Sequence, residues 1–227
     1  MDRVSRKGSV FGLSCDFVVY SWIWFVSCAY YAGAYLMSTF VVFQYANRYP
    51  EHPSFYTSKL TFVLDCVGSL VTSALIYQTF HKYKKSRQGN EALSVLFYYV
   101  LFLMTSGLVW LLWNYLRGKA TLNELDLANY FWLLSYASFS FRLISQCSTN
   151  WFFCRFYNVH KHFLPIQIVS LFFMTNSLAI YKWHNTNWYE LPTNLVSSES
   201  LLLNWICLGI LLYQQHIYKG GKPIIPR

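Results

Sequence analysis

Three charged side chains lie within stretches of the sequence that are otherwise strongly apolar. Asp16 stands near the start of the first such stretch, Asp65 lies in the second and Arg142 in the fourth. A charge at membrane depth costs at least about 2.5 kcal/mol on insertion scales unless it faces protein or water. These three residues are therefore the first candidates for a binding or proton-carrying role.

Two amide residues, Gln146 and Asn150, follow Arg142 in the same apolar stretch. In one interpretation the charged and amide residues line a water-filled pathway between helices. In the other, an aspartate pairs with Arg142 and clamps helices together, while the amides bond to neighbouring helices. The charges alone favour neither interpretation. Further amides that would line the pathway are Gln167, Asn176 and Asn204.

The elements that carry these residues are predicted from composition. Of the 227 residues, 55% are hydrophobic and only 12% are charged, and the apolar residues fall in long runs. A helix crosses a bilayer in roughly 20 residues, and no alternating strand pattern is present. The sequence therefore predicts an all-α, multi-pass membrane protein. Its expected spans are 11–36, 60–80, 93–116, 127–153, 163–183 and 200–218, and the first and fourth are long enough to tilt or to continue as interfacial helices.

The net charge of +9 comes mainly from short basic clusters between the spans. Most of the lysines and arginines fall on the side that holds both termini, which predicts that both termini are cytosolic, or matrix-facing in a mitochondrion. This placement argues against nucleic acid as a partner and for the lipid bilayer. The tryptophans of the spans, such as Trp22 and Trp24, are interpreted as interfacial anchors or packing groups.

The cysteines and histidines do not predict a metal site. The six cysteines contain no Cys-x-x-Cys pair and have no histidine at ligand spacing, so we interpret them as packing thiols. No metal or cofactor is expected.

A resemblance to a known family adds to this interpretation. The run Arg6-Lys7-Gly8-Ser9, followed by Gly12-Leu13-Ser14-Cys15-Asp16-Phe17, resembles the segment after the first Pro-Gln turn of cystinosin-like PQ-loop transporters. Arg142-Leu143-Ile144-Ser145-Gln146, with Asn150, resembles the second PQ-loop, in which a basic residue stands three before Pro-Gln and an asparagine four after the glutamine. The collinear similarity covers nearly the whole chain.

The resemblance implies an incomplete PQ-loop bundle of two helices, a linker helix and three helices. Residues 1–92 would form a partial first repeat, 93–126 the linker helix and its loop, and 127–227 the second repeat. The first helix of the family would be missing, which again places Met1 in the cytosol. The implied location is a lysosomal, vacuolar or other endomembrane; the alternative is the mitochondrial inner membrane.

The departures from the family pattern concern the hinge and the proton. Ser145 replaces the proline that lets the family's helix bend, so the hinge is weakened or lost. Pro165 is either a relocated hinge or a first-turn proline, and its position favours the second. The family acid of the second repeat has no counterpart here, so any proton would be carried by Asp16, alone or with Asp65.

Two functions follow. The first is a transporter of a small organic solute such as an amino acid, with Asp16, Arg142, Gln146 and Asn150 lining the path. The second is a non-transporting structural or accessory subunit of a membrane complex that completes the first repeat. An enzyme is not expected, because no catalytic set of residues falls at recognisable spacing.

Overall fold

The computed structural model describes residues 12–50, 58–83, 85, 92–118, 122–154, 156, 162–184 and 197–218, and all its regular elements are helical. Part of the segment that resembles the family, residues 6–11, lies outside the described residues. The same holds for Arg155, for Lys161 and for the basic residues of both termini. The elements are α2 (Cys15–Met37), α3 (Thr39–Arg48), α4 (Lys59–Tyr77) with its π-helical continuation η1 (Gln78–Lys82), α5 (Val95–Leu116), α6 (Glu124–Phe153), α7 (Phe163–His184) and α8 (Ser198–Ile217).

Among the described helices, α2, α4 with η1, α5, α7 and α8 are each long and apolar enough to cross a membrane. The chain is thus an all-α, multi-pass membrane protein, as expected. The fourth expected span, α6, is 30 residues long but is less apolar than the others and is not among these five helices. Because α6 packs against both α2 and α8, its polar residues Arg142, Gln146 and Asn150 face protein instead of lipid.

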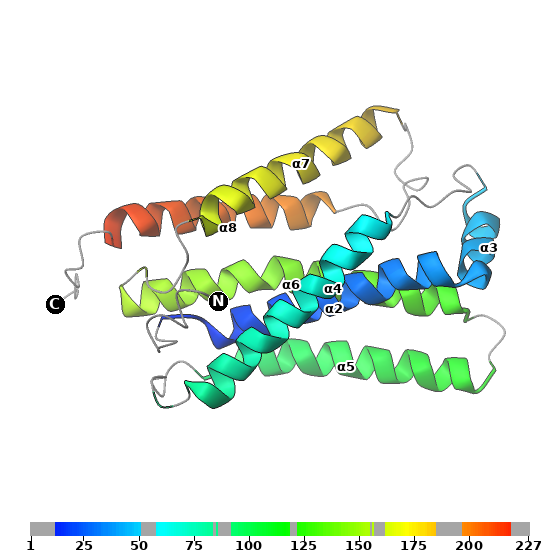
Figure 1. Ribbon diagram of the computed structural model, residues 1–227, viewed down its shortest axis with the longest axis horizontal. Coiled ribbons are helices and arrows are strands. Elements are labelled where there is room, and N and C mark those ends of the chain that lie inside the picture. Colours follow the sequence, from blue (N-terminus) through cyan, green and yellow to red (C-terminus); the bar gives the residue numbers. More distant parts are fainter. Residues whose placement is uncertain are drawn as a thin grey trace.

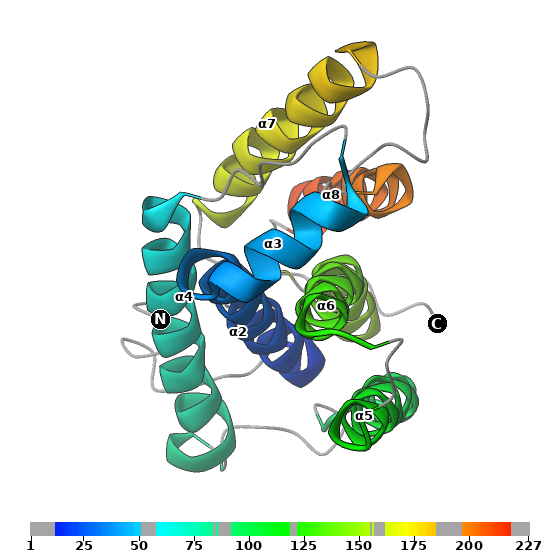
Figure 2. The ribbon, with the colours of Figure 1, turned by 90° about the vertical axis from the view of Figure 1, so that its right-hand side faces the viewer.

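The two most central helices are α2 and α6, which run side by side (Figures 1 and 2). On the far side of α2, α4 crosses obliquely; on the far side of α6 lies α8, and α7 packs on α8. Only weak contacts join α5 to α6, and most of its surface is exposed. This open arrangement leaves broad apolar faces of α4 and α5 for lipid.

The long first apolar stretch is divided into two helices at Ser38. The Ser38 backbone N–H donates to Ala34 O at the end of α2, and its hydroxyl accepts from Val41 N at the start of α3. Figure 1 shows α3 lying across the end of the bundle. Its Val41 and Tyr45 are buried in the bundle, whereas Phe40 and Phe43 are exposed. Of the two outcomes expected for an overlong span, the chain therefore continues into a second, crosswise helix.

Helix starts follow local capping signals. Asn123 and Asp126 form a reciprocal capping box at the start of α6, which satisfies two N-terminal amides that would otherwise lack partners. Serine caps supply the same contact by accepting from a backbone N–H in the first turn. These serines are Ser14 for α2, Ser58 for α4, Ser94 for α5 and Ser197 for α8.

Neither hinge candidate interrupts its helix. Ser145 lies inside α6, where its hydroxyl donates to Phe141 O at 3.3 Å. Pro165 is the third residue of α7, in the first turn, where the missing N–H has no intrahelical partner to lose. Both residues lie in regular helix, so neither position shows the helix bend that a PQ-loop proline would produce.

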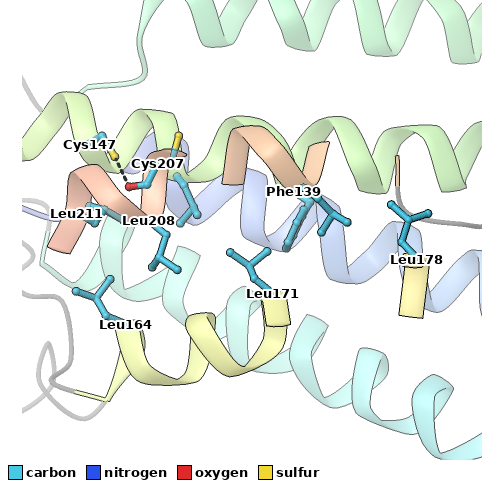
Figure 3. Close-up of a cluster of buried hydrophobic side chains, with 10 residues drawn as sticks. Phe139, Cys147, Leu164, Leu171, Leu178, Cys207, Leu208 and Leu211 are labelled. Atoms are coloured by element: carbon cyan, nitrogen blue, oxygen red, sulfur yellow. Dashed lines mark hydrogen bonds between the residues drawn. The ribbon is translucent and has the colours of Figure 1, made fainter. Parts of the chain in front are cut away.

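The largest apolar core joins α6, α7 and α8 (Figure 3). From α7, Leu164 and Leu171 pack against Leu208 and Leu211 of α8 in this cluster. The six cysteines are all free, and Cys147 Sγ contacts Cys207 O at 3.4 Å within the same core. Cys147 and Cys207 therefore act as packing thiols in this core.

Candidate functional site

Arg142 is the most deeply buried charge of the described residues. It projects from α6 and is only 3% exposed. Its guanidinium lies over two rings, 4.2 Å from the Trp24 ring centroid and 4.6 Å from that of Phe139. Its Nη2 donates to Gln167 Oε1 of α7 at 2.9 Å. Three helices, α2, α6 and α7, therefore meet at this cation.

The contacts of Arg142 are polar and aromatic, and none is a carboxylate. Neither Asp16 nor Asp65 forms an ion pair with it, and its Nε has no hydrogen-bond partner among the described residues. Burying a charge is costly unless it is paired and hydrogen-bonded. Ring faces and one amide offset only part of that cost. The site thus retains an excess positive charge and a free donor that would suit an anionic group.

Gln146 and Asn150, on the next turns of α6, form a buried amide network. The Gln146 side chain accepts from Ser14 N at 3.1 Å and donates to Gly12 O at 3.1 Å and to Asn150 Oδ1 at 2.9 Å. Asn150 in turn donates to Gln214 Oε1 of α8 at 3.2 Å. The network joins the turn before α2, α6 and α8 at one end of the bundle.

A left-handed backbone at Gly12 shapes the turn that this network holds. Gly12 has φ 81°, a conformation that glycine adopts without steric cost. It presents Gly12 O and Ser14 N to the same glutamine side chain. Gln146 therefore holds the backbone just before α2 by two hydrogen bonds.

Asp16 bonds to the start of α5 and does not pair with Arg142, the pairing that one of the two interpretations required. The carboxylate is 6% exposed and its Oδ1 accepts from Ser94 N, the N-cap of α5, at 3.0 Å. A carboxylate at a helix N-terminus is stabilised by the helix dipole and the unpaired amides there. The structure thus gives Asp16 an anchoring contact to α5.

Asp65 lies apart on α4, half-buried and without an ionic partner among the described residues. Asp65 therefore does not neutralise Arg142.

The five expected site residues lie in four separate places. Gln146 and Asn150 share one network, Arg142 lies against the Trp24 and Phe139 rings, Asp16 bonds to the start of α5, and Asp65 lies apart on α4. Of the additional amides, Gln167 reaches Arg142, Asn204 bonds within α8 to Ser200 O at 2.8 Å, and Asn176 is exposed.

Two important contributors were not singled out from sequence. Trp24 was interpreted as an anchor or packing group, and it packs on Arg142; its position well inside the span instead of at an interface was the available signal. Gln214 belongs to a buried face of α8 with three- and four-residue spacing, the signature of one helix side. That face also contains Ser200, Asn204, Cys207 and Leu211.

A second polar group lies at the other end of the bundle, beside α3. Arg48 Nη1 donates to Asp126 Oδ1 at 2.6 Å, and Leu125 N donates to Gln44 Oε1 at 3.0 Å. The hydrogen bond to Asp126 raises the pKa of Arg48 above its ordinary value, so this arginine stays charged at any working pH. These contacts fix α3 to the start of α6.

Comparison with known proteins finds a relative that matches nearly the whole chain. The chain is similar to the uncharacterized protein YCL002C of Saccharomyces cerevisiae, with 26% identity over 96% of this chain and 88% of the yeast protein. No family model matches the chain. The similarity extends over nearly all of both proteins, so it involves the whole helical bundle.

Proposed function

We propose that the chain is a PQ-loop-type transporter for a small organic solute that carries a carboxylate, such as an amino acid. The observation behind this proposal is the buried guanidinium of Arg142, which lacks an acidic partner among the described residues. A solute carboxylate would supply the missing counter-charge, and charge-assisted bonds of this kind are strong when water is excluded. The Trp24 ring and Gln167 would orient the guanidinium for it.

The arrangement of helices supports the proposal. The chain ends in a three-helix unit in which α8 lies between α6 and α7, and it begins with the smaller unit of α2 and α4. The outlying α5 corresponds to the linker helix. Arg142 lies where α2 of the first unit meets α6 and α7 of the second, the position at which transporters with repeats bind substrates.

The amide network gives the proposed pathway a closed end. Gln146, Asn150 and Gln214 are each at most 1% exposed and hold the turn before α2 against α6 and α8. By the positive-inside rule, the proposal has this end face the cytosol. In this proposal Asp16 fixes α5, and Asp65 is the remaining carboxylate that could take up a proton.

The test is uptake of radiolabelled amino acids by the purified protein in liposomes. We expect Arg142→Leu to abolish uptake of the transported amino acid and Arg142→Lys to retain part of it. Arg48→Leu is the matched control, because it removes an arginine that is already neutralised by Asp126. Equal uptake by the wild type and Arg142→Leu would exclude Arg142 from substrate binding.

The accessory-subunit alternative rests on a different observation. Of the residues of α4, only Thr72 is buried, and α4 exposes apolar residues such as Leu60, Leu64 and Leu70 on its free side. A further transmembrane helix from another subunit would cover that side. Native mass measurement in mild detergent distinguishes the two: a monomer or homodimer supports the transporter, and stoichiometric co-purification with other membrane chains supports the subunit.

A further inference from the structure

A cavity of about 490 Å³ lies at the end of the bundle that carries α3. Its walls come from the C-terminal half of α2, the facing ends of α5 and α6, and single residues of α3 and α4. The volume is in the range of sites for small molecules. None of the five expected site residues lines it, so it is separate from the proposed transport path.

Small residues on α2 create this cavity. Ala29, Gly33 and Ala34 line it; the two alanines project little into the space, and Gly33 lets the Phe62 ring of α4 approach α2 closely, because a Cβ there would lie 3.1 Å from that ring. The neighbouring α5 contacts α6 instead, where Tyr130 Oη donates to Met104 O at 2.5 Å. The space between α2 and the end of α5 is therefore not closed by helix packing.

The chemistry of the cavity combines one carboxylate with several aromatic rings. Glu124, in the first turn of α6, lines it together with Tyr30, Phe62 and Tyr115. Because all four side chains line one cavity, the carboxylate and the rings can contact the same ligand. The remaining walls are mostly apolar.

Glu124 has a neutral hydrogen-bond donor but no basic partner. Ser38 Oγ donates to Glu124 Oε2 at 3.3 Å, and no lysine or arginine of the described residues forms an ion pair with it. By contrast, Asp126, two residues further on, is paired with Arg48. The cavity thus contains a carboxylate whose charge is not neutralised by the described protein.

We propose that this cavity binds an organic ammonium group carried on an apolar body. Glu124 would neutralise the ammonium charge, and ring faces attract quaternary and primary ammonium groups through their quadrupoles. The apolar walls of α2 would contact the attached hydrocarbon. Two sources share this chemistry, the headgroup of an amine-bearing phospholipid and a soluble organic amine.

The experiment uses the full chain in nanodiscs and a photoactivatable alkyl-diazirine probe with a trimethylammonium head. The same probe with a hydroxyl head is the neutral control. After irradiation, labelled peptides are identified and quantified by mass spectrometry. We expect the ammonium probe, and not the hydroxyl probe, to label peptides of α2, α5 and α6 that line the cavity.

Three variants test which groups recognise the charge. Glu124→Gln retains an acceptor for Ser38 and should reduce labelling at least about tenfold, the loss of a charge-assisted contact. Tyr115→Leu keeps the carboxylate and should reduce it about threefold to fivefold, the value of one cation–π contact. Glu199→Gln is the matched control, because Glu199 is likewise a glutamate in the first turn of a helix, α8, and it does not line the cavity.

Competition identifies the source of the ammonium group. Suppression by free choline supports a soluble amine, whereas suppression in phosphatidylcholine nanodiscs but not in phosphatidylglycerol nanodiscs supports a lipid headgroup. Equal labelling by the two probes, or an unchanged signal in a folded Glu124→Gln variant, would overturn the proposal. These outcomes do not depend on uptake of amino acids, so they are independent of the proposed transport function.

Discussion

Replacing Gln146 by methionine tests whether the buried amide network holds the bundle together. Methionine has nearly the length and shape of glutamine, so the change removes polar atoms without opening a large cavity. Three hydrogen bonds are lost, to Ser14 N, Gly12 O and Asn150 Oδ1. At about 0.6 kcal/mol for each bond between membrane helices, their loss costs about 2 kcal/mol.

The backbone amide of Ser14 adds to this cost. Ser14 is buried, and an amide that loses its partner inside a protein costs about 1–3 kcal/mol unless the chain moves to satisfy it. We therefore expect Gln146→Met to lower the free energy of unfolding by about 2–5 kcal/mol. The range reflects how far the turn before α2 can open toward water.

The assay is reversible unfolding in mixed micelles of dodecyl maltoside and sodium dodecyl sulfate, followed by circular dichroism. Hydrogen exchange of the peptide that contains Ser14 provides a local readout, and it should be faster in the variant. Ser145→Ala is the control, because Ser145 bonds only within its own helix to Phe141 O and should cost less than about 0.5 kcal/mol. If Gln146→Met matches this control in both assays, the network does not stabilise the bundle.

Two further predictions concern helix packing. A Cβ on Gly68 of α4 would collide with the Phe25 ring of α2, whereas one on Gly209 of α8 would meet nothing within 4 Å. Gly68→Ala should thus destabilise the protein by about 1–3 kcal/mol, and Gly209→Ala should be neutral or stabilising by up to about 1 kcal/mol. Equal melting temperatures for the two variants would contradict the observed α2–α4 packing. Arg48→Gln should lower the free energy of unfolding by less than about 1 kcal/mol, because the ion pair of Arg48 with Asp126 is partly exposed. This difference from the wild type should shrink in high salt. A difference that does not change with salt would mean that Arg48 acts through packing.

Some features follow from the sequence without the tertiary structure. Runs of about 20 apolar residues separated by basic and Pro-containing segments are sufficient to predict membrane helices, because a bilayer accepts few other structures. The helix starts follow from serine and Asn123 caps, which are local signals. The first span was expected to end at Leu36, one residue before the end of α2. Whether this overlong stretch tilts or continues as an interfacial helix was left open, because serine in an apolar run is also compatible with a continuous helix.

The chemistry of the individual polar residues depended on which helices pack together. Asp16 and Arg142 are opposite charges in neighbouring helices, and their types alone allowed an ion pair; in the structure Asp16 bonds to Ser94 N and Arg142 to Gln167 and the Trp24 ring. The rotation of each helix about its axis decides such pairings, and sequence spacing gives only the side of a helix, not its partner.

The Arg142 site and the Glu124 cavity also show what the sequence determined and what the tertiary structure decided. The sequence determined that this chain spans a membrane as helices and carries a few costly polar groups within them. Only the tertiary structure decided that Gln146 holds the turn before α2, that Arg142 lacks an acid among the described residues, and that Glu124 lines a cavity with three rings. Burial and pairing are properties of the contacts between distant segments, and those contacts are set by packing of whole helices instead of by any local pattern.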